Sequence, residues 1–388
     1  MDQLARPDPV ARACETAVEL AAASAEIERT RRIPEPLLSH LHEARLFRML
    51  LPRRFGGDEV EPGTYLLALE ELGRHDASVA WNIFVGNSSA LIAPFIEPES
   101  AEAIFADPRS IIAWGPPNAC RASAVPGGYR VSGAWDFASG CRQANWMGAH
   151  CLVEEPDGSL RLNAAGRPTI RTLLLPAEQA TLLDTWNTIG LRGTASDSYT
   201  LSEVFVPEAF SGTREDPGLR RVKGPLYAFP MQGLYAVGVA GVALGIAREM
   251  LGAFSELAAR KTPRGQKRLA ESAGVQAGVG RAEATLGAAR AYLLATLAEI
   301  YTAADDVLPL AVPERARVRL AATHAIHGAI EVADYVYKAA GVDGIFPGSP
   351  FERRFRDMHT LSQQIQSRDA HYEAVGQVLL GVPPEVFY

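Results

Sequence analysis

Cysteine is scarce in this chain, and basic residues do not outnumber acidic ones. The four cysteines, Cys14, Cys120, Cys141 and Cys151, form no C-x-x-C pair, so neither a disulfide framework nor a structural zinc site is expected. Because an unpaired cysteine behaves as a small hydrophobe, we expect buried free thiols. The net charge of −7 argues against nucleic acid and an anionic membrane as partners.

Other signals are missing as well. We find no apolar run long enough to cross a bilayer, and the opening stretch MDQLARPDPVARACE lacks the pattern of a signal peptide. A cytoplasmic location is therefore expected. No G-x-G-x-x-G motif follows a predicted strand, so a nicotinamide-binding unit is not supported. With 388 residues, the chain is expected to form two or three domains.

The residues that are present change in character along the chain, which predicts an α+β protein of three domains. Residues 1–110 have helical spacing of apolar residues, with Asp76 or Ser78 as the N-cap of one helix. Residues 111–212 hold short segments rich in β-branched and aromatic residues, which predict an antiparallel β-barrel domain. A hairpin turn is expected at Gly127-Gly128. Residues 213–388 predict a C-terminal four-helix bundle.

Two features of the predicted bundle bear on function. The first helix carries Gly233, Gly238, Gly241 and Gly245, and each weakens an isolated helix by up to about 1 kcal/mol. Close packing or a cofactor must therefore approach this helix. The last predicted helix, RDMHTLSQQIQSRDAHYEAVGQVLLG over residues 356–381, carries polar side chains where a core helix would carry leucine.

Three stretches carry a resemblance to a known family. They are YRVSGAWDFASGCRQANW (129–146), DTWNTIGLRGTASDSYTLSEVFVPEAF (184–210) and PFERRFRDMHTLSQQ (350–364). With the order of helices, strands and helices, they resemble the acyl-CoA dehydrogenase superfamily over nearly the whole chain. RDMHTLSQ followed by YEAVGQVLLG, and SVAWNIFVGNS near the N-terminus, are similar to its two-component flavin monooxygenase branch.

The resemblance implies the acyl-CoA dehydrogenase fold and an oxygenase component. Such an enzyme uses diffusible reduced FMN or FAD, supplied by a separate NAD(P)H:flavin reductase, and O₂ to oxygenate an aromatic or polyketide-like small molecule. A homotetramer is also implied. Two alternatives stay open: a flavin oxidase or dehydrogenase of the same fold with a non-CoA substrate, and a non-redox descendant that acts as a dehydratase, cyclase or binding protein.

The positions of the family's catalytic groups discriminate between these activities. Acyl-CoA dehydrogenation needs a carboxylate base, but the matching positions are Ile365 and Tyr235, so this activity ranks low. The monooxygenase branch commonly has histidine where this chain has Gln364. A glutamine amide donates and accepts hydrogen bonds but does not shuttle protons near neutral pH. The substrate then needs no base, another residue supplies it, or oxygenation is altered.

The predicted catalytic residues are Ser139, Gln364, His371 and His359. If the last helix is unbroken, seven residues place Gln364 and His371 on one face, about 10 Å apart along the axis. His359 points elsewhere on the same helix. His324, His327 and Glu331 have a spacing that can suit a metal, but we expect core or interface histidines and no metal.

The resemblance also implies contacts with the flavin. Ser139 matches the position whose hydroxyl approaches the reactive part of the ring, and Trp135 and Phe137 can supply a platform. The motif LRGTAS can meet phosphate or the ring edge through Arg192, Thr194 and Ser196. Within a basic loop, Arg264 can hold an adenosine diphosphate arm. The family more often has glycine where this chain has Ala195, and Asp343 needs a cationic partner beside a phosphate.

A substrate pocket is predicted where the N-terminal helices meet the β domain. Aromatic walls with a few polar groups suit a flat organic ligand. The residues expected to line this pocket are Trp81, Asn87, Ser88, Trp114 and Tyr235.

Overall fold

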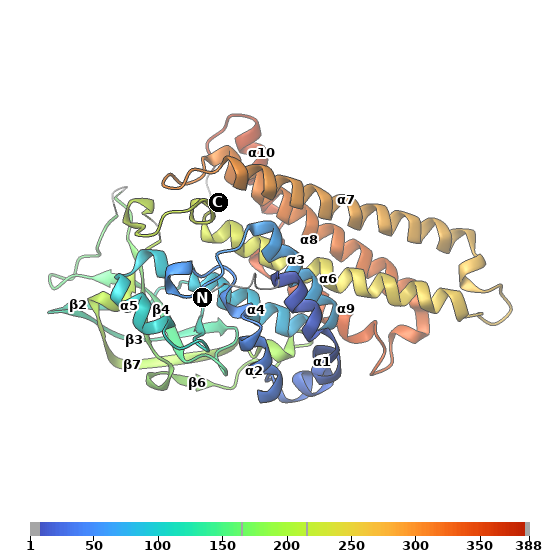
Figure 1. The fold of residues 1–388 in the computed structure, drawn as a ribbon, viewed down its shortest axis with the longest axis horizontal. Helices are drawn as coiled ribbons and strands as arrows, with labels where there is room; N and C mark the ends of the chain where they lie inside the picture. The colour runs from blue at the N-terminus through green and yellow to red at the C-terminus, as the bar shows by residue number, and fades with distance from the viewer. Residues whose placement is uncertain (1–7, 164–165, 215, 385–388) are drawn as a thin grey trace, which may run out of the picture.

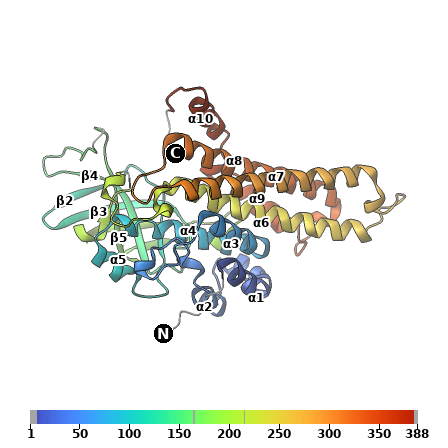
Figure 2. The ribbon, with the colours of Figure 1, turned by 45° about the horizontal axis from the view of Figure 1, so that its top comes forward.

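The computed structural model describes residues 8–163, 166–214 and 216–384. A β domain occupies one end of the elongated molecule, and long helices extend from it toward the other end (Figure 1). The N-terminal helices lie between these parts, against the first long helix (Figure 2). This order of helices, sheet and helices confirms the predicted α+β class.

The N-terminal helices are packed around α4, which is buried along its whole length. Their bounds are α1 Pro9–Thr30, α2 Glu35–Glu43, α3 Pro62–His75, α4 Ala77–Ala90 and α5 Pro98–Phe105. Asp76 is the N-cap of α4, and its side chain accepts a hydrogen bond from the Val79 backbone N–H at 2.9 Å. Of the two residues predicted for this role, Asp76 is therefore the cap.

The strands of the described residues form one 8-stranded sheet, in the order β6-β7-β3-β2-β4-β5-β8 with β1 beside β4. Their bounds are β1 Ile112–Trp114, β2 Arg121–Val125, β3 Gly128–Ala138, β4 Trp146–Glu154, β5 Ile170–Pro176, β6 Thr181–Leu183, β7 Asp197–Pro207 and β8 Ser211–Gly212. Most strand pairs are antiparallel, as predicted, but β4 pairs in parallel with both β1 and β2.

The predicted hairpin joins β2 to β3, with its turn one residue earlier than expected. Gly128 already pairs with Val125, so Pro126 and Gly127 form the turn. Gly127 has a φ of +81°, a backbone conformation that glycine adopts without steric cost. A side chain at Gly128 would clash with the backbone carbonyl oxygen of Val206, at 2.2 Å.

Three long helices form the body of the bundle: α6 Met231–Arg260, α7 Ala273–Ala303 and α8 Val312–Ala340. The glycines of α6 permit close packing against α3 and α4. A Cβ at Gly245 would lie 2.3 Å from the Glu70 carbonyl oxygen, and one at Gly238 would lie 2.6 Å from the Phe84 ring. The sequence left open whether close packing or a cofactor explains these glycines. These distances show that close packing of helices explains Gly238 and Gly245.

The last predicted helix is not continuous. It divides into α9 Glu352–Leu361 and α10 Ala370–Leu379, with a short 3-10 turn, Ile365–Ser367, between them. Gln364 has an extended conformation (φ −72°, ψ 146°). The side chain of Gln366 turns inward to contact Gln232 and Arg319, and these buried tertiary hydrogen bonds compete successfully with continuation of the helix.

Two compositional expectations need correction. Cys141 and Cys151 are buried, but Cys14 is exposed and Cys120 is partly exposed, and all four thiols are free. Contrary to expectation, α6 is long and apolar enough to cross a membrane. However, 83% of its most apolar window is buried, as in the core helix of a bundle.

Candidate functional site

The hydroxyl group of Ser139 lies where the N-terminal helices meet the β domain. Ser139 follows β3, is 8% exposed, and accepts a hydrogen bond from Trp81 Nε1 of α4 at 3.1 Å. Its Oγ lies 2.6 Å from the Oγ of Ser196, which lies 2.8 Å from Thr194 Oγ1. The predicted residues Ser139, Thr194 and Ser196 are thus brought together, along with Trp81.

The direction of these hydrogen bonds follows from their far end. Thr194 donates its proton to the Leu191 carbonyl oxygen at 2.8 Å. Since a hydroxyl has one proton, Ser196 must then donate to Thr194, and Ser139 must donate to Ser196. With one lone pair taken by the Trp81 N–H, Ser139 retains one free lone pair. The site therefore offers a ligand an acceptor at Ser139.

The loop that supplies Ser196 has an unusual backbone. Leu191 and Ala195 have φ values of +49° and +40°, in the left-handed region that costs a residue with a Cβ roughly 1–2 kcal/mol. The glycine usual in the family at Ala195 would avoid that cost. Here, hydrogen bonds to Leu191 hold the conformation: its carbonyl also accepts from Trp186 Nε1 at 2.9 Å.

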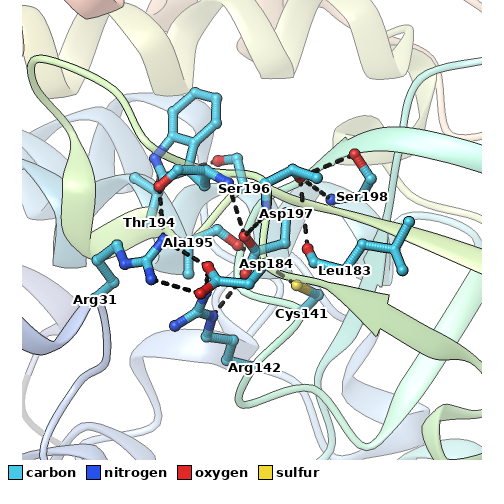
Figure 3. Close-up of polar contacts among 12 residues, drawn as sticks. Arg31, Cys141, Arg142, Leu183, Asp184, Thr194, Ala195, Ser196, Asp197 and Ser198 are labelled. Atoms are coloured by element: carbon cyan, nitrogen blue, oxygen red, sulfur yellow. Dashed lines mark hydrogen bonds and ion pairs between the residues drawn. The ribbon is translucent and has the colours of Figure 1, made fainter.

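A buried carboxylate anchors the same loop from the sheet side (Figure 3). Asp197 is 1% exposed and accepts hydrogen bonds from the backbone N–H groups of Thr185 and Trp186, at 3.0 and 2.9 Å. Arg142 pairs with it at 2.6 Å and also reaches Asp184. These contacts place the Trp186 ring beside the segment that carries Ser139.

A second buried carboxylate anchors the loop from the bundle side. Asp357 of α9 is 6% exposed and accepts a hydrogen bond from the Leu191 backbone N–H at 2.6 Å. Burial raises the pKa of Asp357 to about 7, with a further rise caused by Asp76, against lowering contributions from the Leu191 N–H and Arg353. This carboxyl group therefore titrates near neutral pH.

Aromatic side chains continue from Ser139 into the bundle. The rings of Trp81 and Phe84 meet edge to face with centroids 4.7 Å apart, and Phe84 meets Tyr235 of α6 in the same way at 4.9 Å. Burial raises the pKa of Tyr235, so its hydroxyl stays protonated at neutral pH. Two predicted pocket residues, Trp81 and Tyr235, thus belong to one aromatic cluster through Phe84, which the sequence analysis did not identify.

Asn87 and Ser88 differ in what they can offer a substrate. The Asn87 amide is 0% exposed; it donates to the carbonyls of Leu46 and Ile83 and accepts from the Leu50 N–H. Because its polar atoms are engaged with the backbone, Asn87 supports the fold here, and its place in the pocket stays a prediction. The Ser88 hydroxyl is buried with no hydrogen-bond partner among the described residues.

Trp114 lies on β1 and packs on the face of the sheet that α5 and the end of α4 cover. Its ring meets His150 edge to face at 4.9 Å, and the guanidinium carbon of Arg214 lies 4.9 Å from the ring centre. A surface cavity of about 480 Å³ lies nearby, lined by residues that include Phe95, Arg171, Glu208 and Thr213. Trp114 thus belongs to a separate cluster with a basic residue.

Gln364 uses its side chain locally. Its Oε1 accepts a hydrogen bond from the Gln366 backbone N–H at 2.6 Å, which caps the turn after α9. The amide NH₂ is the part that can still donate. Ile365, at the family's base position, is 50% exposed, while the neighbouring Gln366 is 2% exposed and donates to Gln232 Oε1 at 3.1 Å.

The two predicted histidines are held in different ways. His371 contacts the Ile365 carbonyl oxygen through Nε2 at 2.8 Å, so it lies beside the Gln364 turn. The predicted reason, a shared face of one helix, is wrong because the helix breaks between them. Burial lowers the pKa of His371. His359 instead pairs with Asp334 of α8 at 2.9 Å.

The structure separates the two aromatic residues predicted as a flavin platform. Trp135 is 0% exposed, stacks on Tyr199 and donates to the His150 carbonyl, so its assignment is wrong. Phe137 is 61% exposed and meets Trp186 edge to face at 6.3 Å. A bulge between Trp135 and Ala138 and a φ of +62° at Phe137 turn the two rings away from each other.

These surroundings fit a reduced flavin. An exposed apolar ring at Phe137, a free acceptor at Ser139 and a buried Oδ1 on Asn82 that has no hydrogen-bond partner within the described part of the chain supply a platform and polar contacts for a planar, polar-edged ring. The chemistry that reduced flavin supplies is the transfer of electrons to O₂. Arg192 is half-buried beside this site, and one of its N–H groups donates to the Thr188 carbonyl.

Arg264 lies far in space from Ser139 and the other residues of the candidate flavin site. It is exposed on the loop between α6 and α7, at the end of the bundle away from the β domain (Figure 1). Within one chain, the structure therefore does not bring it to Ser139. Asp343 has the cationic partner that it needs, since Lys261 forms an ion pair with it.

Sequence reasoning missed the residues that hold the site in place. Asp197, Asp357 and Gln366 carry no recognisable spacing, and only their burial and their contacts identify them. One usable signal existed for Asp357, because an acidic residue directly follows three basic side chains in RRFRD. Arg214 lies in a connecting segment where nothing local distinguishes it from a solvated arginine.

Comparisons with known proteins identify the family of the chain. Residues 2–102 match the acyl-CoA dehydrogenase N-terminal domain, and residues 237–368 match the acyl-CoA dehydrogenase C-terminal domain. Indole-3-acetate monooxygenase of Pseudomonas putida is 30% identical over 364 residues, covering 92% of this chain and 90% of that protein. The oxygenase component of FADH(2)-dependent resorcinol hydroxylase from Rhizobium sp. is 29% identical, covering 94% and 91%.

Solved structures show the same architecture. XiaF from Streptomyces sp., in complex with FADH2 and glycerol, superposes with a TM-score of 0.89 at 25% identity, covering 98% of this chain and 96% of that one. The HsaA monooxygenase from M. tuberculosis superposes with a TM-score of 0.87 at 22% identity, covering 98% of each chain.

Proposed function

Because the chain belongs to the acyl-CoA dehydrogenase family, in its branch of two-component flavin-dependent monooxygenases, we propose that the site around Ser139 oxygenates a planar aromatic small molecule. The chain is an oxygenase component that uses reduced flavin, either FMN or FAD. The flavin comes from a separate reductase, for which NAD(P)H is the expected electron source. These features confirm the predicted enzyme class and cofactor.

The free lone pair of Ser139 is the observation that carries this proposal. A reduced flavin ring presents an N–H at its reactive centre, whereas an oxidised ring presents a bare nitrogen. An acceptor held in place by Trp81 and Ser196 favours the reduced form. Thr194 and Leu191 fix the direction of the hydrogen bonds, so Ser139 does not need to reorient when the ligand binds.

The aromatic cluster supports a flat substrate. Trp81, Phe84 and Tyr235 bring ring edges and faces from α4 and α6 to one place, and such walls bind planar organic ligands. Relatives act on indole-3-acetate and resorcinol, as their names state. We therefore place this chain's substrate among the small aromatic compounds, with polyketide-like aromatics included.

The proposed proton handling uses the segment after α9. Gln364 positions the substrate through its amide NH₂, since its Oε1 caps the turn. His371, with its pKa lowered by burial, is a neutral imidazole at pH 7 and can accept a proton. His359 can act in the same way only if its contact with Asp334 opens.

We also propose a homotetramer in the cytoplasm, with domains at residues 1–110, 111–212 and 213–388. The outward face of α7 supports the assembly, because small side chains let a second helix approach closely. The exposed residues on this face include Ala277, Ala284, Ala288, Ala291 and Ala295. In such an assembly, Arg264 of one subunit can serve a flavin bound to another.

Anaerobic titration with reduced and oxidised FMN and FAD tests the proposal. We expect tighter binding of the reduced forms. After mixing the reduced complex with O₂, we expect a single turnover of oxygenated product from at least one of indole-3-acetate, resorcinol and indole, and continued turnover only when reductase and NAD(P)H are present. Turnover with flavin but without a reductase would point to an oxidase. No affinity for any reduced flavin would exclude the redox function.

A further inference from the structure

Helix α9 holds a short stretch of backbone on the loop of the candidate flavin site. Asp357 accepts a hydrogen bond from the Leu191 N–H at 2.6 Å, and the neighbouring Arg356 donates to the Ile189 carbonyl oxygen. Between these contacts, Gly190 packs directly on α9, since a Cβ at this position would lie 2.2 Å from the Arg356 carbonyl oxygen. We call these three contacts the α9 clamp.

The α9 clamp holds Leu191 in a conformation that a residue with a Cβ disfavours. Its φ of +49° lies in the left-handed region. In this conformation the Leu191 carbonyl oxygen accepts hydrogen bonds from Thr194 Oγ1 at 2.8 Å and from Trp186 Nε1 at 2.9 Å. Loss of the bond from the Leu191 N–H to Asp357 therefore lets Leu191 rotate, and this rotation moves the oxygen to which Thr194 donates.

The position of that oxygen determines what Ser139 offers to a ligand. While Thr194 donates to Leu191, Ser196 donates to Thr194, and Ser139 donates to Ser196, because each hydroxyl group has one proton. Without a fixed acceptor for Thr194, the three protons can reverse their direction. Ser139 can then donate to a ligand as well as accept from it, so it no longer distinguishes a ligand N–H from a bare nitrogen.

The strength of the α9 clamp depends on the charge of Asp357. A carboxylate accepts a backbone hydrogen bond more strongly than a neutral carboxyl group does. The charged groups that act on Asp357 come from three elements: Glu28 of α1, Asp76 at the start of α4, and Arg353 and Arg354 of α9 itself. Burial and the two acidic groups raise the pKa of Asp357 to about 7, against the opposing effect of Arg353.

We propose that Asp357 is a positioning residue of the flavin site: as a carboxylate it holds Leu191, and its protonation releases Leu191 and removes the preference of Ser139 for reduced over oxidised flavin. This inference rests on the proposed function. Asp357 contacts neither flavin nor substrate in this scheme, and acts only through Leu191 and the hydroxyl groups beyond it. The site then selects the reduced flavin above about pH 7 and accepts both redox forms below it.

Anaerobic titrations at about pH 6 and about pH 8 test this inference, with oxidised and reduced FMN and FAD. The quantity compared is the dissociation constant of the oxidised form divided by that of the reduced form. Because reduced flavin itself loses a proton in this pH range, the native ratio is divided by that of Asp357→Asn at the same pH. Asparagine resembles the protonated carboxyl group, so we expect a quotient near 1 at the lower pH and about 10 at the higher pH.

Two further variants separate the clamp from the charge. Gly190→Ala should displace the loop from α9 without changing a charge, because its Cβ would meet the Arg356 carbonyl oxygen. Its quotient should be near 1 at both pH values. Glu256→Gln removes an exposed carboxyl group of α6 and should behave like the native protein.

A second measurement needs no flavin. Trp186 donates to the same Leu191 carbonyl oxygen, so its indole reports the position of this group. Fluorine NMR of protein labelled with 5-fluorotryptophan records its signal, which Trp186→Phe assigns. In the native protein we expect this signal to shift with a midpoint near pH 7, and in Asp357→Asn we expect no such shift.

The inference is overturned if the native quotient is the same at both pH values, or if Asp357→Asn keeps the pH-dependent shift of the Trp186 signal. Absence of binding by either redox form of the flavin would refute the proposed function and the inference with it. A Trp186 signal that still titrates in the same flavin-free protein distinguishes that result from failure of the α9 clamp.

Discussion

The Asp357 carboxylate accepts a hydrogen bond from the backbone N–H of Leu191 at 2.6 Å. The two residues are 166 positions apart, and their contact joins the bundle to the loop that carries Thr194 and Ser196. Leu191 also accepts from Thr194 and Trp186, so one residue connects Asp357 to the hydroxyl groups around Ser139. The protonation state of Asp357 therefore affects both the stability of the folded protein and the loop that holds the hydroxyl groups around Ser139.

Replacing Asp357 by asparagine should remove a pH dependence of stability. The pKa of Asp357 is raised from its ordinary value of 3.8 to about 7, so between about pH 4 and pH 7 the folded state holds a proton that the unfolded state releases. The free energy of unfolding therefore falls as pH rises through this range, by up to a few kcal/mol, and levels off above it.

Urea denaturation of the native protein and Asp357→Asn across pH 4.5–8, which spans roughly this window, provides the measurement. Asparagine keeps an oxygen acceptor for Leu191 but cannot ionise, so its stability should fall less with pH and exceed that of the native protein above pH 7. Asp369→Asn, at a side chain that is 94% exposed, is the matched control. Parallel pH curves for native protein and Asp357→Asn would show that this carboxyl group does not titrate as described.

Ser139→Ala should weaken binding of reduced flavin more than binding of oxidised flavin. The substitution removes the free acceptor and leaves the Trp81 N–H and Ser196 hydroxyl without their partner. Loss of one such hydrogen bond costs about 1–1.5 kcal/mol, or roughly tenfold in the dissociation constant of the reduced form. Ser123→Ala, on the exposed side of β2, serves as the control. Equal weakening of both redox forms would mean that Ser139 does not face the reactive nitrogen.

Asn87→Ala should reduce stability without changing substrate affinity. The amide forms three hydrogen bonds to buried backbone groups, and leaving such groups unpaired costs about 2–4 kcal/mol in the free energy of unfolding. Chemical denaturation measures this loss. Asn118→Ala, whose side chain makes similar bonds at an exposed position, should lose less than about 1 kcal/mol. A large rise in KM with unchanged stability would confirm Asn87 as a pocket residue.

Gln364→His should raise activity on phenols. A histidine can take a proton from a phenol through its one acceptor nitrogen, and it then gives up the hydrogen bond from the Gln366 N–H that Gln364 accepts. General-base catalysis of this kind raises rates tenfold or more, on the order of 10²–10⁴ at best. Steady-state oxygenation of resorcinol measures the change. Gln363→His, at the exposed neighbouring position, is the control. If both variants behave like the native enzyme, residue 364 does not contact the substrate.

Local patterns were sufficient for most of the fold. Helical spacing of apolar residues and the cap at Asp76 depend on neighbours within a few residues, and both were predictable. The hairpin after Val125 follows from Pro126 and Gly127 for the same reason. The resemblance, by contrast, implied one shared platform for the rings of Trp135 and Phe137. A bulge between them reversed this, because it shifts the register of the strand with respect to β7.

The break after α9 could not be predicted locally either. Nothing in the sequence near Gln366 indicates that Arg319 and Gln232, far away along the chain, compete for its side chain. The same holds for Asn87, whose backbone partners nothing in the sequence indicates. Polar residues in a sequence do not reveal which partners will satisfy them.

The sequence by itself determined the family, the order of secondary structure and the reliance on reduced flavin, because short motifs and periodic patterns carry that information. Only the tertiary structure decided which hydroxyl groups meet at Ser139 and that Asp357 holds their loop. Those relationships depend on burial and on contacts between distant segments, and these quantities arise only when the whole chain has packed.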